Sequence, residues 1–310
     1  MKNLITILFV LFSIQLFSQQ LPDRSNFEGN SFVWNPAMTA VRTYWELGAT
    51  YKQQWLGFQD APRTAIVSFQ YPFVDTNMSA GVFITHDNTH PIQFNSISFT
   101  YNYQLPLNLF KDDRLSIGIM GSMGEFSIDS DRIMVGDAAD VLLPNDEVSS
   151  LIPNAGFGIF YISEKERFYN NGFYIGIGSN QLLSNDLIFD TDGTPLNLRR
   201  DIHANGIVGF TFLAAQDLLI EPSVWVDYAS KNVTNINFGI LLEKQDAFWG
   251  GLNFSLSQEF SLQAGLILKE GFFKDGIMRI GTKASYNMGT LGMDLGFGYE
   301  FYVAYRFENE

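Results

Sequence analysis

The side chains that most often carry chemistry are few in this sequence. It contains three histidines and no cysteine, which excludes thiol catalysis, thiolate metal sites and disulfide bonds. His86 and His90 stand four residues apart beside Asp87. That spacing places two ligands on one face only in a helix, and the surrounding residues predict a strand end and a turn. We therefore expect a solvated turn at this place and no transition-metal site.

Two acidic stretches are similar to the start of a calcium loop, Asp129-Ser130-Asp131 and Asp190-Thr191-Asp192-Gly193. A calcium loop needs a bidentate Glu at its twelfth position, where this sequence has Asp140 and Asp201. A hydrolase that pairs His203 with a serine of a neighbouring strand stays open as an alternative, although the sequence has no nucleophile-elbow motif. We expect no enzyme activity, no cofactor and no metal.

The composition points to a large apolar chain of a particular kind. The 310 residues are 46% hydrophobic and 15% aromatic, but only 17% are charged, against about 25% in an ordinary soluble domain. No window after the N-terminus holds the roughly 18 apolar residues that a membrane-spanning helix needs. The net charge of −14 argues against a nucleic-acid partner, because phosphate neutralisation needs a basic face.

The first residues have the pattern of an export signal. Lys2 supplies a positive charge, Leu4 to Phe12 form an apolar run, and Ser18 is a small residue before two glutamines. We interpret residues 1–18 as a cleaved signal peptide. The mature chain then crosses an inner membrane.

The mature chain repeats one unit, a stretch of alternating side chains followed by a turn. In residues 94–103 one face carries Ile97, Phe99, Tyr101 and Tyr103, and the other carries Ser96, Ser98, Thr100 and Asn102. A period of two is the period of a β-strand. Fourteen segments follow this pattern: Tyr44–Trp55, Thr64–Tyr71, Ser79–Asp87, Gln93–Leu105, Arg114–Ser127, Ala155–Ile162, Phe173–Asn180, His203–Ala214, Leu218–Tyr228, Val233–Glu243, Ala247–Ser255, Phe260–Lys269, Ile277–Asn287 and Leu295–Phe307.

Either a soluble β-sandwich or propeller, or a membrane barrel, could use so many strands. A soluble protein would carry charged residues on its second face, whereas here that face carries mostly Gly, Ser, Thr, Asn and Gln. Aromatic residues recur near strand ends, where they form girdles in membrane barrels. We therefore predict an antiparallel transmembrane β-barrel of about fourteen strands over residues 44–310, with a periplasmic lead-in over 19–43 and mostly neutral lumen positions.

Connection lengths support this prediction. If strand one rises from the periplasm, connections after odd-numbered strands face outside, where bacterial barrels have their long loops. The two longest connections, residues 128–154 and 181–202, both follow odd-numbered strands. The first is strongly acidic. We expect both to lie outside the cell.

Two motifs stand near the start of the mature chain, Asn35-Pro36-Ala37 and the segment Gln54 to Thr64. Pro36 disfavours helix at Asn35, so an extended segment or turn should precede strand one. The second motif predicts a hairpin with an interfacial Trp55, and a glycine-permitted turn with Phe58 folded back. With a signal peptide that ends Ser-Gln-Gln, these motifs resemble the PorP/SprF family of the type IX secretion system. Pro153 to Tyr161, Phe173 to Gly178 and Glu221-Pro222-Ser223 are similar to later family blocks.

The resemblance implies a non-enzymatic outer-membrane barrel that supports secretion or surface attachment of particular cargo, such as gliding adhesins. It also implies association with the periplasmic ring and motor of that machinery, and with outer-membrane lipid. The alternative is an outer-membrane pore or small-molecule transporter. We expect the lead-in to dock to the periplasmic machinery, and the hairpin and acidic loops to hold cargo. The alternative for both motifs is that they only plug and brace the barrel. The candidate partner-binding residues are Asn35, Pro36, Gln54, Trp55, Gly57, Phe58 and Pro62.

Overall fold

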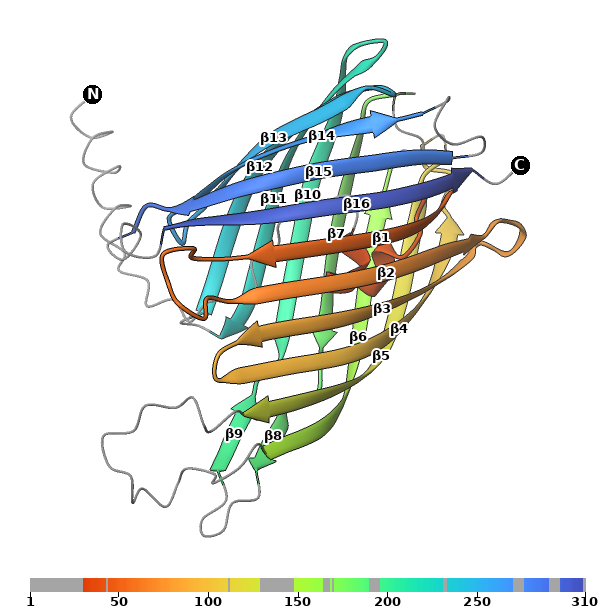
Figure 1. Cartoon of the computed structure of the whole chain (residues 1–310). Helices are drawn as coiled ribbons and strands as arrows, with labels where there is room; N and C mark the ends of the chain where they lie inside the picture. Colours follow the sequence, from red (N-terminus) through yellow and green to blue (C-terminus); the bar gives the residue numbers. More distant parts are fainter. Residues whose placement is uncertain are drawn as a thin grey trace, which may run out of the picture.

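The computed structural model describes residues 30–42, 44–110, 112–128, 148–163, 168, 170–189, 196–230, 233–269, 276–289 and 296–308. Figure 1 shows their arrangement. The predicted signal peptide, the rest of the lead-in before residue 30, and most of the acidic connection after strand five lie outside these residues, so the expectations about them stay predictions.

Fourteen antiparallel strands form one closed barrel, in which each strand pairs with its neighbours in sequence and β1 pairs with β16. The strands are β1 (Tyr44–Gln53), β2 (Arg63–Phe73), β3 (Met78–Thr89), β4 (Ile92–Pro106), β5 (Arg114–Ile128), β6 (Val148–Ile162), β7 (Gly172–Gln181), β10 (His203–Ala215), β11 (Leu218–Ser230), β12 (Val233–Lys244), β13 (Phe248–Ser255), β14 (Glu259–Leu268), β15 (Gly276–Asn287) and β16 (Phe297–Glu308). A separate two-stranded sheet of β8 (Asn185–Phe189) and β9 (Leu196–Arg200) lies between β7 and β10.

The barrel and its strand number are confirmed, and each predicted segment overlaps one strand. The largest difference is β6, which begins at Val148 and not at Ala155 because its first residues pair with the end of β5, from Ile128 opposite Val148. β5 and β7 end, and β6 and β10 begin, at the same end of the barrel as the β1–β2 connection. We call this the loop end, and the opposite end, where β1 begins and β16 finishes, the turn end.

The predicted facing of the strands is also confirmed. On β4 the side chain of Phe99 is 59% exposed and that of Ser98 is 3% exposed. Aromatic residues gather at both ends: Trp45 stacks on Phe307 near the turn end, and Tyr51 contacts Tyr299 near the loop end. Phe297 and Phe307 lie ten positions apart on β16, which corresponds to about 25 Å along the axis of a tilted strand. This is the height of a membrane-barrel apolar band.

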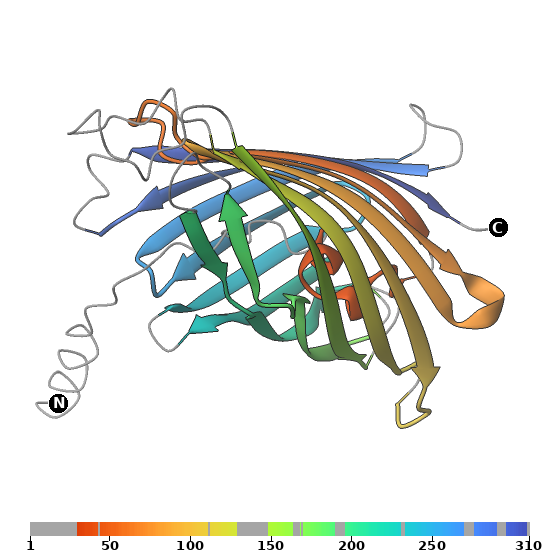
Figure 2. The same cartoon turned by 90° about the horizontal axis from the view of Figure 1, so that it is seen from below.

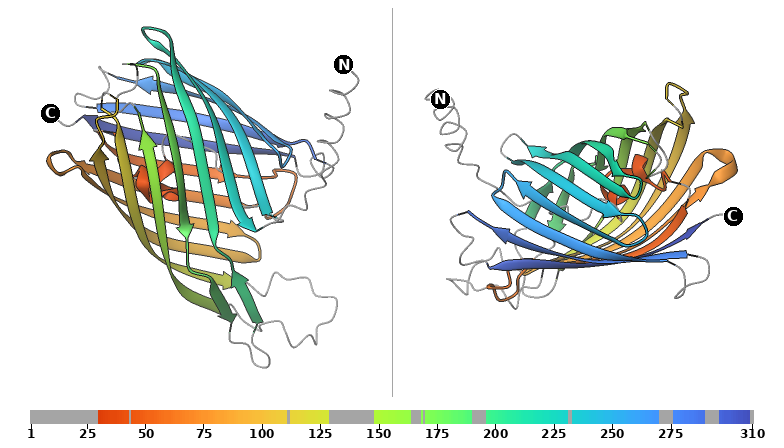
Figure 3. Two further views of the ribbon diagram at one scale, coloured as in Figure 1. Left: turned by 180° about the vertical axis from the view of Figure 1, so that it is seen from behind. Right: turned by 90° about the horizontal axis from the view of Figure 1, so that it is seen from above.

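A short segment before β1 lies inside the barrel. It contains α2 (Ser31–Trp34) and the 3-10 helix η1 (Pro36–Met38), and Figures 2 and 3 show it as a red ribbon enclosed by the strands. Phe32, Asn35 and Ala37 have no exposed surface. We call residues 30–42 the plug. No helix among the described residues is long and apolar enough to cross a membrane.

The position of the plug corrects the prediction of a periplasmic lead-in for residues 30–42. Its apolar side chains pack inside the barrel with residues of β3, β5, β6, β7, β10 and β11. Phe32 makes an edge-to-face contact with Phe83, with 5.6 Å between ring centroids. Burying these side chains removes apolar surface from water, which stabilises the segment in the lumen.

Candidate functional site

The plug begins its tight turn at the predicted Asn-Pro-Ala motif. Asn35 is extended, as expected for a residue before proline, and its side-chain Oδ1 accepts a hydrogen bond from the Ala37 N–H at 3.0 Å. Pro36 then starts η1, where its missing N–H has no cost. The Asn35 Nδ2 donates to the Ile177 carbonyl of β7 at 3.1 Å. One side chain therefore caps the turn and ties it to the wall.

Glycines of three adjacent strands make room for this turn. A Cβ atom at Gly158 would lie 1.9 Å from Asn35 Oδ1, and one at Gly118 would lie 2.3 Å from the Ala37 nitrogen. At Gly178 the distance to Asn35 Cγ would be 2.6 Å. These distances are shorter than van der Waals contact, so larger residues at these positions would force the turn out of its place. Glycine is therefore required where the plug approaches the wall.

Amides and hydroxyls of the strands bind the rest of the plug. Asn205 donates to the Trp34 carbonyl at 2.9 Å, and Asn102 donates to the Thr39 carbonyl at 3.0 Å. The Ala40 N–H donates to Gln70 Oε1 at 2.7 Å. Asn30 donates to the Thr50 hydroxyl at 2.6 Å. Since these bonds come from β1, β2, β4 and β10, the plug is held on several sides of the lumen.

The lumen beside β12 to β16 is filled by charged side chains of the strands themselves. Arg279 makes two hydrogen bonds of 3.0 Å to the carboxylate of Glu243, and both side chains are 4% exposed. Arg306 donates from Nε to Oε2 of Glu46 on β1, and both side chains are buried. Lys283 lies 3.9 Å from Glu259. The prediction of mostly neutral lumen positions is therefore wrong for this part, which we call the charged sector.

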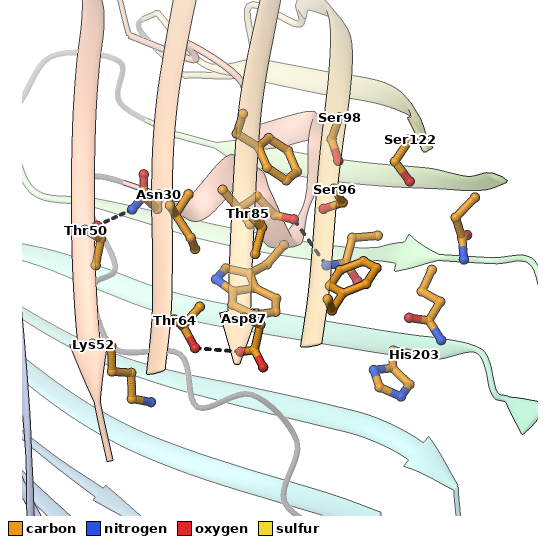
Figure 4. Close-up of a pocket in the computed structure, with 18 of the residues that line it drawn as sticks. Asn30, Thr50, Lys52, Thr64, Thr85, Asp87, Ser96, Ser98, Ser122 and His203 are labelled. Carbon is orange, nitrogen blue, oxygen red and sulfur yellow. Dashed lines mark hydrogen bonds between the residues drawn. The ribbon is translucent and has the colours of Figure 1, made fainter. Parts of the chain in front are cut away.

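A cavity of about 420 Å³ lies on the loop-end side of the plug, and we call it the chamber. Asn30, Val33 and Trp34 of the plug line it, together with strand residues such as Thr85, Ser98 and Ser122. Figure 4 shows Asn30, Thr85, Ser98 and Ser122 around the space. A smaller cavity of about 70 Å³ touches the plug at Met38, Ala40 and Val41, near Tyr44 at the turn end. The plug therefore stands between the two cavities.

Charged groups of the chamber include one cation on the β8–β9 sheet. The guanidinium of Arg200 lies 4.8 Å from the ring centre of Phe94 and 5.1 Å from that of Phe126. Burial lowers the pKa of Arg200 to about 10, because the charged form loses water. The group is therefore still charged at neutral pH.

The predicted partner-binding residues fall into three groups. Asn35 and Pro36 are fully buried in the plug, so they present no surface to a partner in this conformation. Gln54, Trp55 and Pro62 line the chamber. Phe58 is 59% exposed. Gly57 is exposed beside it.

The β1–β2 connection differs from the predicted hairpin in two respects. Phe58 was expected to fold back, but its side chain is 59% exposed. The turn was expected to use Gly57, but the residues with positive φ are Trp55 (+52°) and Asp60 (+62°). The Leu56 N–H donates to the Phe297 carbonyl of β16 at 2.8 Å. This bond fixes the connection on the barrel rim, with Phe58 and the half-exposed Leu56 outward.

The three histidines lie at the loop end in separate places. His86 Nδ1 contacts Asn95 Oδ1 at 2.6 Å, and His90 Nε2 lies 3.6 Å from Asp60. His203 lines the chamber. Within the described part of the chain, no group of three or more potential ligands could hold a metal ion. The two calcium-like stretches, residues 129–131 and 190–193, lie outside that part.

A closed fourteen-stranded barrel with an apolar outer belt and a filled lumen defines an outer-membrane β-barrel protein. The chain belongs to the family described as type IX secretion system membrane protein PorP/SprF, whose family model matches residues 16–305.

The sequence did contain a signal for the plug, the cluster of glycines at lumen positions of β5, β6 and β7. We had interpreted these glycines only as small residues that suit a barrel lumen.

Solved structures with the same fold are outer-membrane barrels. The Ralstonia pickettii toluene transporter TbuX is 11% identical, with a TM-score of 0.56, and the match covers 96% of this chain and 100% of that one. A Pseudomonas aeruginosa FadL homologue is 11% identical, with a TM-score of 0.55 and coverage of 94% and 95%. At this identity the likeness concerns the fold. No curated protein matches the chain in sequence.

Proposed function

We propose that this protein is a non-enzymatic component of type IX secretion that supports the secretion or surface attachment of particular cargo, such as gliding adhesins. It does so together with periplasmic components of the same machinery. The observation that carries the proposal is the filled lumen. The plug occupies one part of the barrel interior, and buried ion pairs occupy the other.

A filled lumen favours a cargo-supporting role over the alternative of a passive pore. A diffusion pore needs a continuous aqueous path, and here the plug separates the chamber from the cavity at the turn end. The charges of the charged sector pair directly with one another and are buried. The toluene transporters share only the fold, so their substrates are not transferred to this chain.

Cargo contact is proposed for the loop end, which we expect to face outside the cell. Phe58 and Leu56 are exposed there on a connection that is hydrogen-bonded to β16. Trp55, Gln54 and Pro62 lie on the chamber side of the same connection. The connection can thus contact one partner with its exposed residues on the barrel rim and with its residues that line the chamber. Residues 30–42 are buried, so docking to periplasmic components is proposed for the turn end of the barrel.

The test replaces Trp55 and Phe58 by alanine together and measures cargo at the surface of intact cells by an impermeant label. We expect normal amounts of barrel in the outer membrane and a severe loss of surface cargo. Phe73→Ala is the matched control, because Phe73 is 45% exposed at the turn end, and it should leave surface cargo unchanged. Full surface cargo in the double variant would contradict the role of the connection.

A further inference from the structure

The guanidinium of Arg200 is held against two aromatic rings in the wall of the chamber. Phe94 and Phe126 lie on adjacent strands, 4.3 Å apart between ring centres, and Arg200 stands over both. Stacking on rings orients a guanidinium by its face and leaves its N–H groups at the edge free to bind. Arg200 also borders the chamber. The structure thus presents a fixed cation to the cavity.

No carboxylate pairs with this cation among the residues that the structure describes. The contacts of the Arg200 guanidinium there are the rings of Phe94 and Phe126. Its pKa is lowered by burial alone, whereas a neighbouring carboxylate would raise it. A cation that has lost part of its water and has no anionic partner is costly. A ligand that carries an anion would remove this cost.

The nearby acidic side chains of the chamber have partners of their own. Asp87 accepts hydrogen bonds from the Thr64 hydroxyl at 2.6 Å and from the Thr89 hydroxyl at 3.1 Å. Asp227 accepts one from the Trp225 indole N–H at 3.0 Å. These carboxylates are therefore bound within the barrel wall, whereas the described part of the chain makes no hydrogen bond to the polar edge of Arg200.

The remaining chamber walls combine apolar surfaces, hydroxyls and amides with the charged side chains of Lys52 and Glu300. Trp34, Trp55 and Phe83 contribute aromatic surface, and Thr85, Ser96 and Asn180 contribute hydrogen-bonding groups. The volume of about 420 Å³ falls in the range of roughly 300 to 1,000 Å³ that is usual for ligand pockets. A ligand that fits these walls has an apolar, preferably aromatic, body and a few polar groups beside its anion.

We propose that the chamber binds a carboxylate attached to an aromatic or aliphatic group, with Arg200 as the residue that holds the carboxylate. Two sources can supply this chemistry, a polypeptide end or acidic side chain of the cargo, and a free small carboxylic acid. A polypeptide as the source of the carboxylate rests on the proposed function. The binding of a carboxylate by Arg200 does not depend on that function.

The test measures binding to the purified full-length protein in detergent, followed by tryptophan fluorescence, since Trp34 and Trp55 line the chamber. The probes are N-acetylphenylalanine and N-acetylphenylalanine amide, which differ only in the charge of the terminal group. A charged hydrogen-bonded pair in a buried site predicts about tenfold or more tighter binding of the acid.

Two variants test whether Arg200 causes the preference for the acid over the amide. Arg200→Gln should abolish the preference for the acid over the amide. Because Arg200 lies on β9, outside the barrel strands, this variant should keep its β-rich circular dichroism spectrum. Arg63→Gln is the matched control: Arg63 begins β2 at the same end, is exposed and does not line the chamber, so the preference should persist. An equal affinity for acid and amide in the unchanged protein, no saturable binding, or a preference that survives in Arg200→Gln would overturn the proposal.

A second arm separates the two sources. Phenylacetate is compared with an acetylated Ser-Gly-Phe peptide that has a free carboxyl end. Tighter binding of the peptide supports a polypeptide ligand, because the extra backbone would use the hydroxyls and amides of the walls. Equal or tighter binding of phenylacetate overturns that source. These measurements use isolated protein, so their failure leaves the cargo proposal to its separate test in cells.

Discussion

On the side of β3 to β7 the lumen is filled by a separate segment of chain, whereas on the side of β12 to β16 the strands fill it with their own side chains. The plug is held by neutral amides and hydroxyls and by glycines that admit its backbone. The charged sector is closed by Arg279 with Glu243 and by Arg306 with Glu46. Trp249 fills the space over Gly265 and Gly281.

The difference teaches which part of the lumen can change. Each neutral hydrogen bond to the plug has a net stabilisation of about 1 kcal/mol, and the plug is joined to the barrel only at its connection to β1 among the described residues. A buried ion pair is costly to separate, since either charge left alone keeps its desolvation penalty. We therefore expect the side chains of the charged sector to stay in place, and the plug to be the part of the lumen that can leave it.

The largest effect is expected from breaking the Arg279–Glu243 pair. Arg279→Met should lower the free energy of unfolding by about 3 to 5 kcal/mol, because Glu243 would remain buried after losing both hydrogen bonds from the Arg279 guanidinium. Denaturant unfolding of the barrel in detergent or lipid measures this loss. Adding Glu243→Leu to Arg279→Met should restore most of the stability. If the double variant were as unstable as the single one, the wall would depend on something other than the pair.

The outer surfaces of the barrel on the plug side and on the charged-sector side should respond alike to a charged substitution, since both face lipid. Phe99→Arg on β4 and Ile280→Arg on β15 replace exposed apolar side chains near the middle of their strands. Each should cost about 2 to 4 kcal/mol if the position is near the bilayer centre. Ser98→Arg, on the lumen face beside the chamber, should cost far less. Equal losses of folded protein for Phe99→Arg and Ser98→Arg would contradict the facing.

A smaller effect is expected in the plug. Asn35→Ala removes the bonds to the Ala37 N–H and to the Ile177 carbonyl and should cost about 1 to 3 kcal/mol. Thermal unfolding in detergent measures it. Asn35→Ser retains an acceptor for the Ala37 N–H and should lose less. A loss as large as that of Arg279→Met would mean that the plug is as fixed as the charged wall.

Most of the barrel was predictable from the sequence because lipid and lumen impose opposite side chains on alternate positions. The alternation in β4 gave both the strand and its facing, as the exposures of Phe99 and Ser98 confirm. The charged sector was harder to predict. Arg279, Lys283 and Glu300 stand at lumen positions, but the partners that pair with two of them, Glu243 and Glu259, lie on other strands, so only register reveals the pairs.

The plug could not be placed from its own residues. Its two helical turns have four and three residues, too few for a helical period to appear. The turn at Asn35 and Pro36 was predicted from proline chemistry, but its position inside the barrel was only the alternative to a periplasmic lead-in. The chamber was missed for the same reason, because its floor is the plug and one of its cations, Arg200, comes from the sheet outside the barrel.

Ion conductance across planar lipid bilayers tests most directly whether the plug closes this barrel. The unchanged protein should show no steady conductance, deletion of residues 30–40 should produce discrete open steps, and Trp249→Ala in the charged sector should stay closed. Circular dichroism and gel mobility of the unheated protein would establish that all three barrels are folded. If the unchanged protein conducted as readily as the deletion variant, the lumen would be open in the presence of the plug, and a pore would be the better account of its function.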